Sequence, residues 1–553
     1  MSDFLETVKA VEKMLSTVPA GALVTQDTLN SVSSQMSKQH TFASLAEAAS
    51  ALDQTRQVEG VKAHLIALRF VVATEDSLSR EEGDAAAIQC LCDAVAATIA
   101  PKTSPEGGGD ESTSYEEIAQ RSYELAPYGL AILSECVKKH AAILSEDALL
   151  TVIAFLPPRS SLSPAAREHA KHSQGSPAYP WVNLEAIHFP EEIILQQYNA
   201  SFSSKEDILV ETILKGYLRP MFSKSKPNTI TQSGRKAEFP DEHDPHRALE
   251  VENSEVKPWK YADHRAIAVL AWAVNEAEEE LISKQWPLFI PVLLTLVDDG
   301  STRVRAPGLA ILCAFLLKFP SNILRDTGLT SVFEDAILPT LHFLPSLTPE
   351  EESIQLLDPA YTALLTLAKK TDAKASSGQY AGTRTTKSQL LDKILRDGIF
   401  SAYFHAKEHI RIVKVLCLHM SNIIHEMGIH AVKHLKDLIP MHSEIMTNPF
   451  APLAPDTLRA ALESLHAILT NCWPRLSTPA YQDELIKMLV VCFINIEEES
   501  KDDLVDIKKS IIKTAAIFMT ASKTADKGGD NLNAKVKPLI AQEPLLAALF
   551  KQT

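Results

Sequence analysis

The stretch WPLFIPVLLTLVDDGSTRVRAPGLAIL, residues 286–312, consists of two apolar runs separated by a short polar turn. The turn, DDGST, contains a glycine and small hydroxyl residues, which are common where one helix ends and the next is capped. The stretch therefore predicts a helical hairpin. Such hairpins occur both in globular bundles, which can hold a small-molecule site, and in repeating scaffolds, which mainly present surface.

Helical periodicity is strong along almost all of the chain. Leu458, Leu462, Leu465 and Leu469 fall on one face of a helix. The run Thr348–Glu351 supplies an N-cap, a first-turn proline and a capping-box glutamate in order. Because apolar and polar residues rarely alternate with a period of two, the sequence predicts an all-α protein.

The composition indicates the kinds of partner and compartment to expect. The chain has 553 residues, a formal net charge of −16 and seven cysteines. An acidic chain has no strong cationic field to neutralise phosphates, so we expect no direct binding of nucleic acid. The cysteines have no disulfide-framework spacing, as is typical of free thiols in a reducing compartment. We expect a cytoplasmic protein that could also enter the nucleus.

Neither the N-terminus nor the apolar runs indicate a membrane protein. The first residues, MSDFLETVKAVEKML, include early acidic residues and lack the features of a secretory signal. Apolar runs such as PLFIPVLLTLV are shorter than the roughly 18–20 residues that a membrane span needs. We therefore expect no contact with a membrane.

Past residue 256 the predicted helices come in pairs. Candidate pairs occupy residues 286–318, 330–369, 389–427, 429–470 and 482–521. Their lengths approach the roughly 40–47 residues of HEAT and armadillo repeats, in which neighbouring repeats cover each other's apolar faces. We therefore predict an α-solenoid of HEAT-like helical-hairpin repeats, with the quoted hairpin as one of its units.

Segments rich in Pro, Gly, Ser, Thr and charge divide the chain, because they can bury too little apolar surface to offset the entropy of ordering. They are residues 102–115, 156–181, 221–247 and 370–388. We predict four regions on this basis. These are an N-terminal helical, solenoid-like region at 1–220 with loops at 102–115 and 156–181, a flexible linker at 221–255, the HEAT-like repeats at 256–522, and a C-terminal tail with a short helix at 523–553.

The quoted hairpin also resembles the HEAT repeat in the residues around its turn. Pro291 precedes Asp299, and Val304 and Arg305 follow. The resemblance implies that Asp299 accepts hydrogen bonds at the turn and that Arg305 reaches towards a neighbouring repeat, while Val304 enters the core. Pro291 should bend the first helix. Pro307 lacks an N–H group, so we expect the second helix to start late or to bend.

A wider segment resembles one family. The segment KPWKYADHRAIAVLAWAV (257–274), the DTGL turn (326–329) and the block LPSLTPEEES (344–353) are similar to the second Tel-Two-interacting proteins, over roughly residues 256–520. The resemblance implies a non-catalytic scaffold subunit of the Triple-T (TTT) co-chaperone complex, bound to Tel-Two and Tti-one. Such a subunit would support the maturation, stability and assembly of phosphatidylinositol-3-kinase-related kinases with the ninety-kilodalton heat-shock chaperone. It would need no cofactor.

Two other functions remain open from the residues alone. His405, Glu408 and His409 match the H-x-x-E-H pattern of some zinc peptidases, so a zinc metallohydrolase is an alternative, although a third ligand is not evident. The other alternative is a generic HEAT-repeat adaptor in transport. On the scaffold interpretation no metal is bound, and Lys433 and Lys436 are candidate partner-binding residues on the later repeats.

Overall fold

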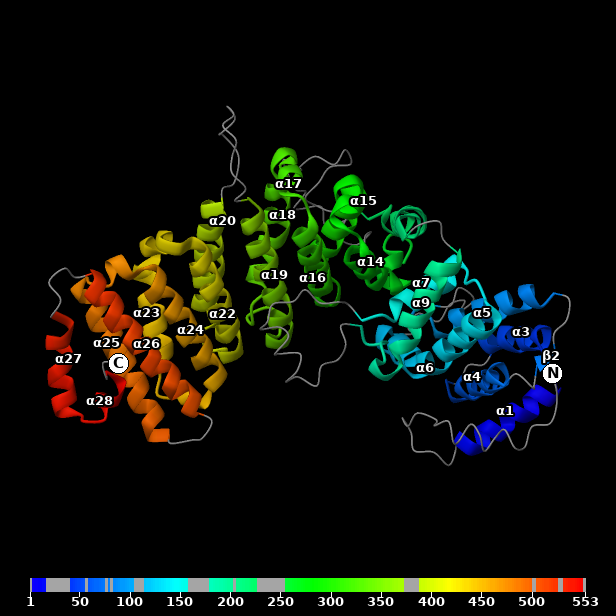
Figure 1. Cartoon of the computed structure of the whole chain (residues 1–553), viewed down its shortest axis with the longest axis horizontal. Coiled ribbons are helices and arrows are strands. Elements are labelled where there is room, and N and C mark those ends of the chain that lie inside the picture. The colour runs from blue at the N-terminus through cyan, green and yellow to red at the C-terminus, as the bar shows by residue number, and fades with distance from the viewer. Residues whose placement is uncertain are drawn as a thin grey trace. The chain divides into compact units, whose positions relative to one another are not determined.

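The computed structural model in Figure 1 places most of the chain. It describes residues 2–15, 40–54, 58–74, 78–79, 83–103, 114–157, 179–201, 205–225, 254–371, 387–499, 504–525 and 531–550. Most of the predicted loops at 102–115, 156–181 and 370–388, and most of the predicted linker at 221–255, lie outside the described residues. The four predicted regions therefore remain a prediction.

Helices account for nearly all of the described residues, which confirms the all-α prediction. Within the described ranges, the strands are β1 (His40–Thr41) and β2 (Leu78–Ser79), which pair in parallel. The described residues divide into two compact units, one ending at Asp299 and the other beginning at Gly300. The two helices of the quoted hairpin thus belong to different units.

In the first unit, many helices pack on a helix that is not their immediate neighbour along the chain. α3 packs on α5, α5 on α7 and α7 on α14, while α4 packs on α6 and α6 on α9. Two layers of alternating helices result, as in a stack of hairpins. The longer elements are α1 (Ser2–Leu15), α3 (Phe42–Ser50), α4 (Val58–Ala73), α5 (Asp84–Ile99), α6 (Tyr115–His140), α7 (Glu146–Ala154), α9 (His188–Ser201), the π-helical η4 (Ile208–Leu218), α14 (Arg265–Glu276) and α15 (Glu279–Asp298). The shorter ones are η1 (Ala51–Gln54), η3 (Leu184–Ala186), α10 (Lys205–Asp207), α11 (Arg219–Phe222) and α13 (Pro258–Tyr261).

The second unit contains the helix pairs that the sequence predicts past residue 328. Their first members are α18 (Leu329–Ile337) with η5 (Leu338–His342), α20 (Lys387–Lys393) with η6 (Ile394–Phe400) and α21 (Ser401–Ala406), η7 (Gly428–His434) with α23 (Leu435–Met446), and α25 (Pro479–Glu499). Their second members are α19 (Glu350–Thr371), α22 (Ile410–Met427), α24 (Pro455–Asn471) and α26 (Val505–Ala525). The remaining elements are α16 (Thr302–Lys318), α17 (Ser321–Thr327), η8 (Ala451–Leu453), η9 (Trp473–Arg475), α27 (Asn531–Gln542) and α28 (Leu546–Leu549).

These pairs stack in sequence order. Helices α16, α19, α22, α24 and α26 each pack on the next, and we call them the second-helix stack; Figure 1 shows α19, α22 and α24 side by side. In the other layer α23 packs on α25. No pair can bury its apolar face alone, so its neighbours supply the cover. The prediction of HEAT-like helical-hairpin repeats is therefore confirmed.

One glycine shows how closely the pairs approach. A Cβ atom at Gly398, in η6, would lie 2.8 Å from Cδ1 of Leu341 and 3.1 Å from Cε1 of Tyr361. A larger residue would force the Leu341 and Tyr361 side chains, or η6 itself, to shift, because protein interiors are close-packed. The absence of a side chain at this position thus allows the two pairs to approach closely.

Two described segments are longer and more apolar than the sequence runs suggested. Glu279–Asp298 and Ile410–Met446 could cross a membrane by length and composition, and the bent pair Thr302–Lys318 and Ser321–Thr327 would add a third if counted as one span. The lengths of the apolar runs in the sequence therefore do not exclude a membrane span. In both of the first two segments 56% of the apolar window is buried by other parts of the chain, as in a core helix.

Candidate functional site

Asp299, at the end of α15, is held by two lysines from an earlier segment of the chain. The residue is only 4% exposed. Its carboxylate accepts hydrogen bonds from Nζ of Lys257 at 3.1 Å and from Nζ of Lys260 at 3.0 Å. Lys257 is the N-cap of α13 and Lys260 lies within it, so the contact fixes the segment 257–261 against the end of α15. Asp299 is thus the central carboxylate of a buried ionic cluster with two lysines within the first unit.

Trp259, between the two lysines, is also buried. Its ring stacks on Phe222 with the centroids 4.9 Å apart, and its Nε1 donates to Oγ of Ser225 at 2.9 Å. The residues of the KPWK segment therefore serve to join α13 to α11 and α15.

The other predicted turn residues lie in the helices on either side. Pro291 lies within a continuous α15, and Val304, on α16, is buried. The guanidinium of Arg305 lies over the ring of Phe343, the residue that follows η5, at 4.4 Å from the ring centroid. Because α16 begins at Thr302, the predicted late start of this helix is wrong, and Pro307 is accommodated inside it.

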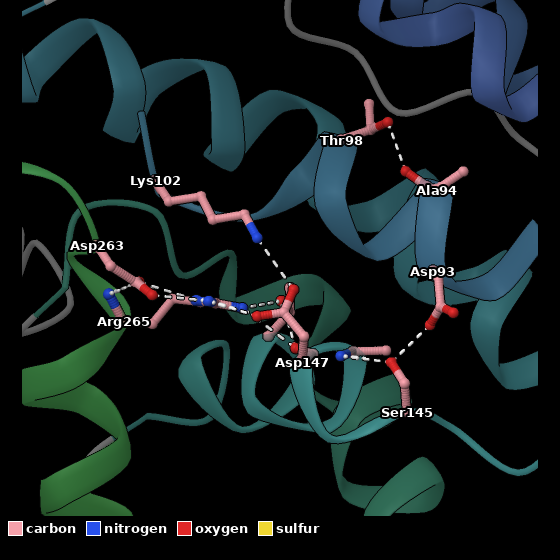
Figure 2. A network of polar contacts seen from close by, with 10 residues as sticks. Asp93, Ala94, Thr98, Lys102, Ser145, Asp147, Asp263 and Arg265 are labelled. Atoms are coloured by element: carbon pink, nitrogen blue, oxygen red, sulfur yellow. Dashed lines mark hydrogen bonds and ion pairs between the residues drawn. The ribbon is translucent and has the colours of Figure 1, made fainter. Parts of the chain in front are cut away.

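A second polar network, centred on buried Arg265, joins α7 to α14, and Figure 2 shows it. The Arg265 side chain, 2% exposed, donates from Nε to Oδ1 of Asp263 at 2.9 Å, and from Nη2 to Oδ1 of Asp147 at 2.8 Å. Its Nη1 donates to Oγ1 of Thr151 at 2.7 Å. Nζ of Lys102 donates to the other carboxylate oxygen of Asp147, Oδ2, at 3.0 Å. One arginine thereby ties together segments 118 residues apart.

The charges in this network stabilise one another. Burial acts to raise the pKa of Asp147, but hydrogen bonds and charge from Arg265 and Lys102 outweigh it and lower that pKa below its usual range. Burial acts to lower the pKa of Arg265, while Asp263 and Asp147 raise it. The guanidinium therefore stays charged inside the first unit, because acceptor oxygens of the protein take the place of water around it.

The H-x-x-E-H motif does not have the helical geometry that a zinc-peptidase site needs. His405 lies near the end of α21, whereas His409 is the N-cap of α22, with the helix break between them. The two histidines are therefore not one turn apart on a single helix. Nδ1 of His409 instead lies 3.0 Å from Oε2 of Glu350. Across the described ranges, no three His, Cys, Asp or Glu side chains are grouped so that they could hold a metal ion.

Replacing His405 and His409 together with glutamine is expected to lower the free energy of unfolding by less than about 1 kcal/mol, because the His409–Glu350 pair is partly exposed. Thermal melting of the double variant beside wild type measures this. Mass spectrometry of the purified wild type should find no stoichiometric zinc. Zinc that is present in wild type and lost in the variant would support the metallohydrolase instead.

Three other histidines form buried contacts between helices. Nε2 of His419 lies 2.8 Å from Oδ1 of Asp358, and Nε2 of His434 lies 2.8 Å from Oδ1 of Asp392. His442 is fully buried. Its Nδ1 lies 2.8 Å from the carbonyl oxygen of Leu438, and its Nε2 lies 2.6 Å from Oγ of Ser464 on α24. These histidines are structural links of the repeats.

His442 should make stability depend on pH. Burial lowers its pKa to about 4, against 6.5 for the unfolded chain, so the unfolded state binds more protons between these values. Stability is therefore lost as pH falls through this window, by about 2 kcal/mol from pH 7 to pH 5. Denaturant melts of wild type and His442→Gln at both pH values test this, with exposed His430→Gln as the control. Equal slopes in wild type and His442→Gln would contradict it.

Polar contacts between consecutive pairs of the second unit recur at the length of one repeat. Lys407 with Glu444 spans 37 residues, Lys433 with Asp392 spans 41 and Lys414 with Asp456 spans 42. The candidate partner-binding residue Lys433 is thus already engaged with Asp392, although it remains exposed, and Lys436 is exposed on α23. These pairs fix the register of adjacent repeats.

Comparison with known families identifies the chain. The model of the Tti2 family matches residues 170–453, which is more than half of the sequence. This chain belongs to the Tti2 family. Tti2 proteins are subunits of the TTT complex. The family match begins well before residue 256, so the Tti2 signal extends into a region where the sequence showed only generic amphipathic helices.

Two solved structures are similar to this Tti2-family chain. Importin beta matches with a TM-score of 0.39 and 10% identity, over 92% of this chain and 61% of that one. Lph2, a bidirectional nuclear transport receptor of S. cerevisiae, matches with a TM-score of 0.37 and 12% identity, over 99% of this chain and 61% of that one. The Tti2-family chain spans about 61% of the length of each.

Proposed function

We propose that this chain is a non-catalytic scaffold subunit of the TTT co-chaperone complex. In that role it binds Tel-Two and Tti-one and supports the maturation, stability and assembly of phosphatidylinositol-3-kinase-related kinases with the ninety-kilodalton heat-shock chaperone. The observation that carries this proposal is the Tti2 family match over residues 170–453. It acts in the cytoplasm, with the nucleus as a second location.

The arrangement of side chains supports a scaffold role. Stacked helical pairs spread a binding surface over several repeats, so affinity can come from area and shape rather than from one pocket. The polar residues that the sequence pattern singled out are engaged in holding helices together. Asp299, for example, accepts hydrogen bonds from Lys257 and Lys260. His409 likewise pairs with Glu350.

Purification of the tagged full chain from its own cells tests the proposal. We expect Tel-Two and Tti-one to co-purify in equimolar amounts after a high-salt wash. Depleting the chain should lower the steady-state amount of the kinases, and re-expression should restore it. A chain that purifies alone, or whose depletion leaves the kinases unchanged, would overturn the proposal.

A further inference from the structure

Large apolar side chains are exposed at the turns within the helix pairs of the second unit. Leu347 precedes α19 and is 92% exposed, and Phe404 near the end of α21 is 77% exposed. Ile410 begins α22, while Phe450 and Leu453 lie between α23 and α24, and all three are more than half exposed. We call these five residues the turn edge. Single exposed apolar residues are ordinary, but a group of them marks an interaction site.

Polar contacts place these turns next to one another. His409 and Glu350 are 3.0 Å apart, which brings the start of α22 to the start of α19. Oγ1 of Thr457 donates to the carbonyl oxygen of Ile410 at 3.2 Å, which brings the start of α24 to the start of α22. Figure 1 shows the same order of helices. The turn edge is therefore one strip across three consecutive pairs.

The length of this strip fits a helix. Packed helices lie about 8–10 Å apart, so three neighbouring helices span roughly 20 Å. A partner helix rises about 1.5 Å per residue, so about 14 residues cover this length, with apolar residues at a spacing of three and four.

Charge on the turn edge favours a cationic partner. Among the described residues at these turns and at the next turn, between α25 and α26, carboxylates outnumber lysines and arginines. The carboxylates are Glu350, Glu351, Glu352, Glu408, Glu444, Asp456, Glu497, Glu498, Glu499 and Asp506. The cations are Lys407, Arg411, Lys414, Arg459, Lys508 and Lys509.

Every one of these cations is already paired with one of these carboxylates. Arg411 pairs with Glu351, Lys407 with Glu444, Lys414 and Arg459 with Asp456, Lys508 with Glu497, and Lys509 with Asp506. In the described part of the chain, no lysine or arginine forms an ion pair with exposed Glu408 or Glu498. An approaching protein thus meets an apolar strip with surplus negative charge beside it.

We propose that the turn edge binds an amphipathic helix of a partner protein, with its apolar face on Leu347, Phe404, Ile410, Phe450 and Leu453 and with lysines or arginines along its flanks. This inference rests on the proposed function, because it names the surface through which a partner subunit docks. Apolar contact supplies most of the affinity, and the flanking charges set orientation and specificity.

Two designed helical peptides of about 14 residues test the chemistry, both with the same leucine face, one flanked by lysines and one by glutamates. Fluorescence anisotropy with the full chain should show the lysine peptide binding at least about tenfold more tightly. The double variant Phe404→Ser/Phe450→Ser should weaken this binding at least about tenfold. Ile429→Ser, an exposed apolar residue outside the turn edge, is the control and should change nothing. Equal binding of both peptides, or equal binding by wild type and double variant, would overturn the inference.

Co-purification separates this inference from the proposed function. If wild type and Ile429→Ser retain Tel-Two and Tti-one, and the double variant loses one of them at an unchanged melting temperature, the inference is supported. If the double variant retains both, the inference fails and the proposed function stands. If wild type retains neither, the proposed function itself fails. Sedimentation that shows a wild-type dimer abolished by the double variant would instead assign the edge to a second copy of the chain.

Discussion

Arg265→Met is expected to lower the free energy of unfolding of the first unit by about 3–5 kcal/mol. The substitution removes the donor shared by Asp263, Asp147 and Thr151. Without the guanidinium, the oxygen atoms of these three residues lose their donor. Water cannot readily replace it at Asp263, because that side chain is only 14% exposed. Guanidinium denaturation followed by circular dichroism gives the loss.

Lys102→Met is the matched control. Lys102 contacts the same carboxylate of Asp147, but this pair is partly exposed, so its loss should cost less than about 1 kcal/mol. Similar small losses in both variants would show that Arg265 does not hold α14 to α7.

Asp299→Ala should be nearly as damaging, at about 3–5 kcal/mol. A residue that only capped the turn would cost about 0.5–2 kcal/mol when lost. The larger value follows because the carboxylate accepts from two lysines whose side chains are 12% and 9% exposed. Thermal and denaturant melts measure the effect, and co-purification of partners should weaken only in proportion to unfolding.

Two further variants separate charge from shape at this position. Asp299→Asn keeps one oxygen acceptor and should lose less stability than Asp299→Ala. Removing all three charges, as Lys257→Met, Lys260→Met and Asp299→Leu together, should recover much of the loss, because an apolar triad can replace a buried ionic one. If Asp299→Ala melts like wild type but loses its partner, this end of α15 is an interface and not an internal joint.

The helices and their pairing could be predicted because both depend on local spacing. The apolar face from Leu458 to Leu469 and the capping pattern at Thr348–Glu351 are properties of adjacent turns, and α24 and α19 formed where they indicated. The turn edge could not be predicted. Leu347 and Phe404 read as ordinary core residues until the surrounding helices are placed.

The contacts of the polar residues were less predictable, because their partners lie far along the chain. Asp299 meets lysines 39 and 42 residues earlier, and Arg265 meets Asp147 from 118 residues away. The H-x-x-E-H pattern failed for another reason. Its spacing assumes an unbroken helix, whereas α21 ends before His409 begins the next helix.

The recurring contacts of the second unit have a mechanical consequence. Each of these contacts joins adjacent helix pairs only; they are Lys407 with Glu444, Lys433 with Asp392 and Lys414 with Asp456. These contacts therefore do not link distant pairs to one another. A molecule stretched from its ends should yield one pair at a time, each freeing about 40 residues, or roughly 140 Å of chain at about 3.3–3.6 Å per residue. Its force–extension trace should show a series of nearly equal extension steps, one for each helix pair that unfolds.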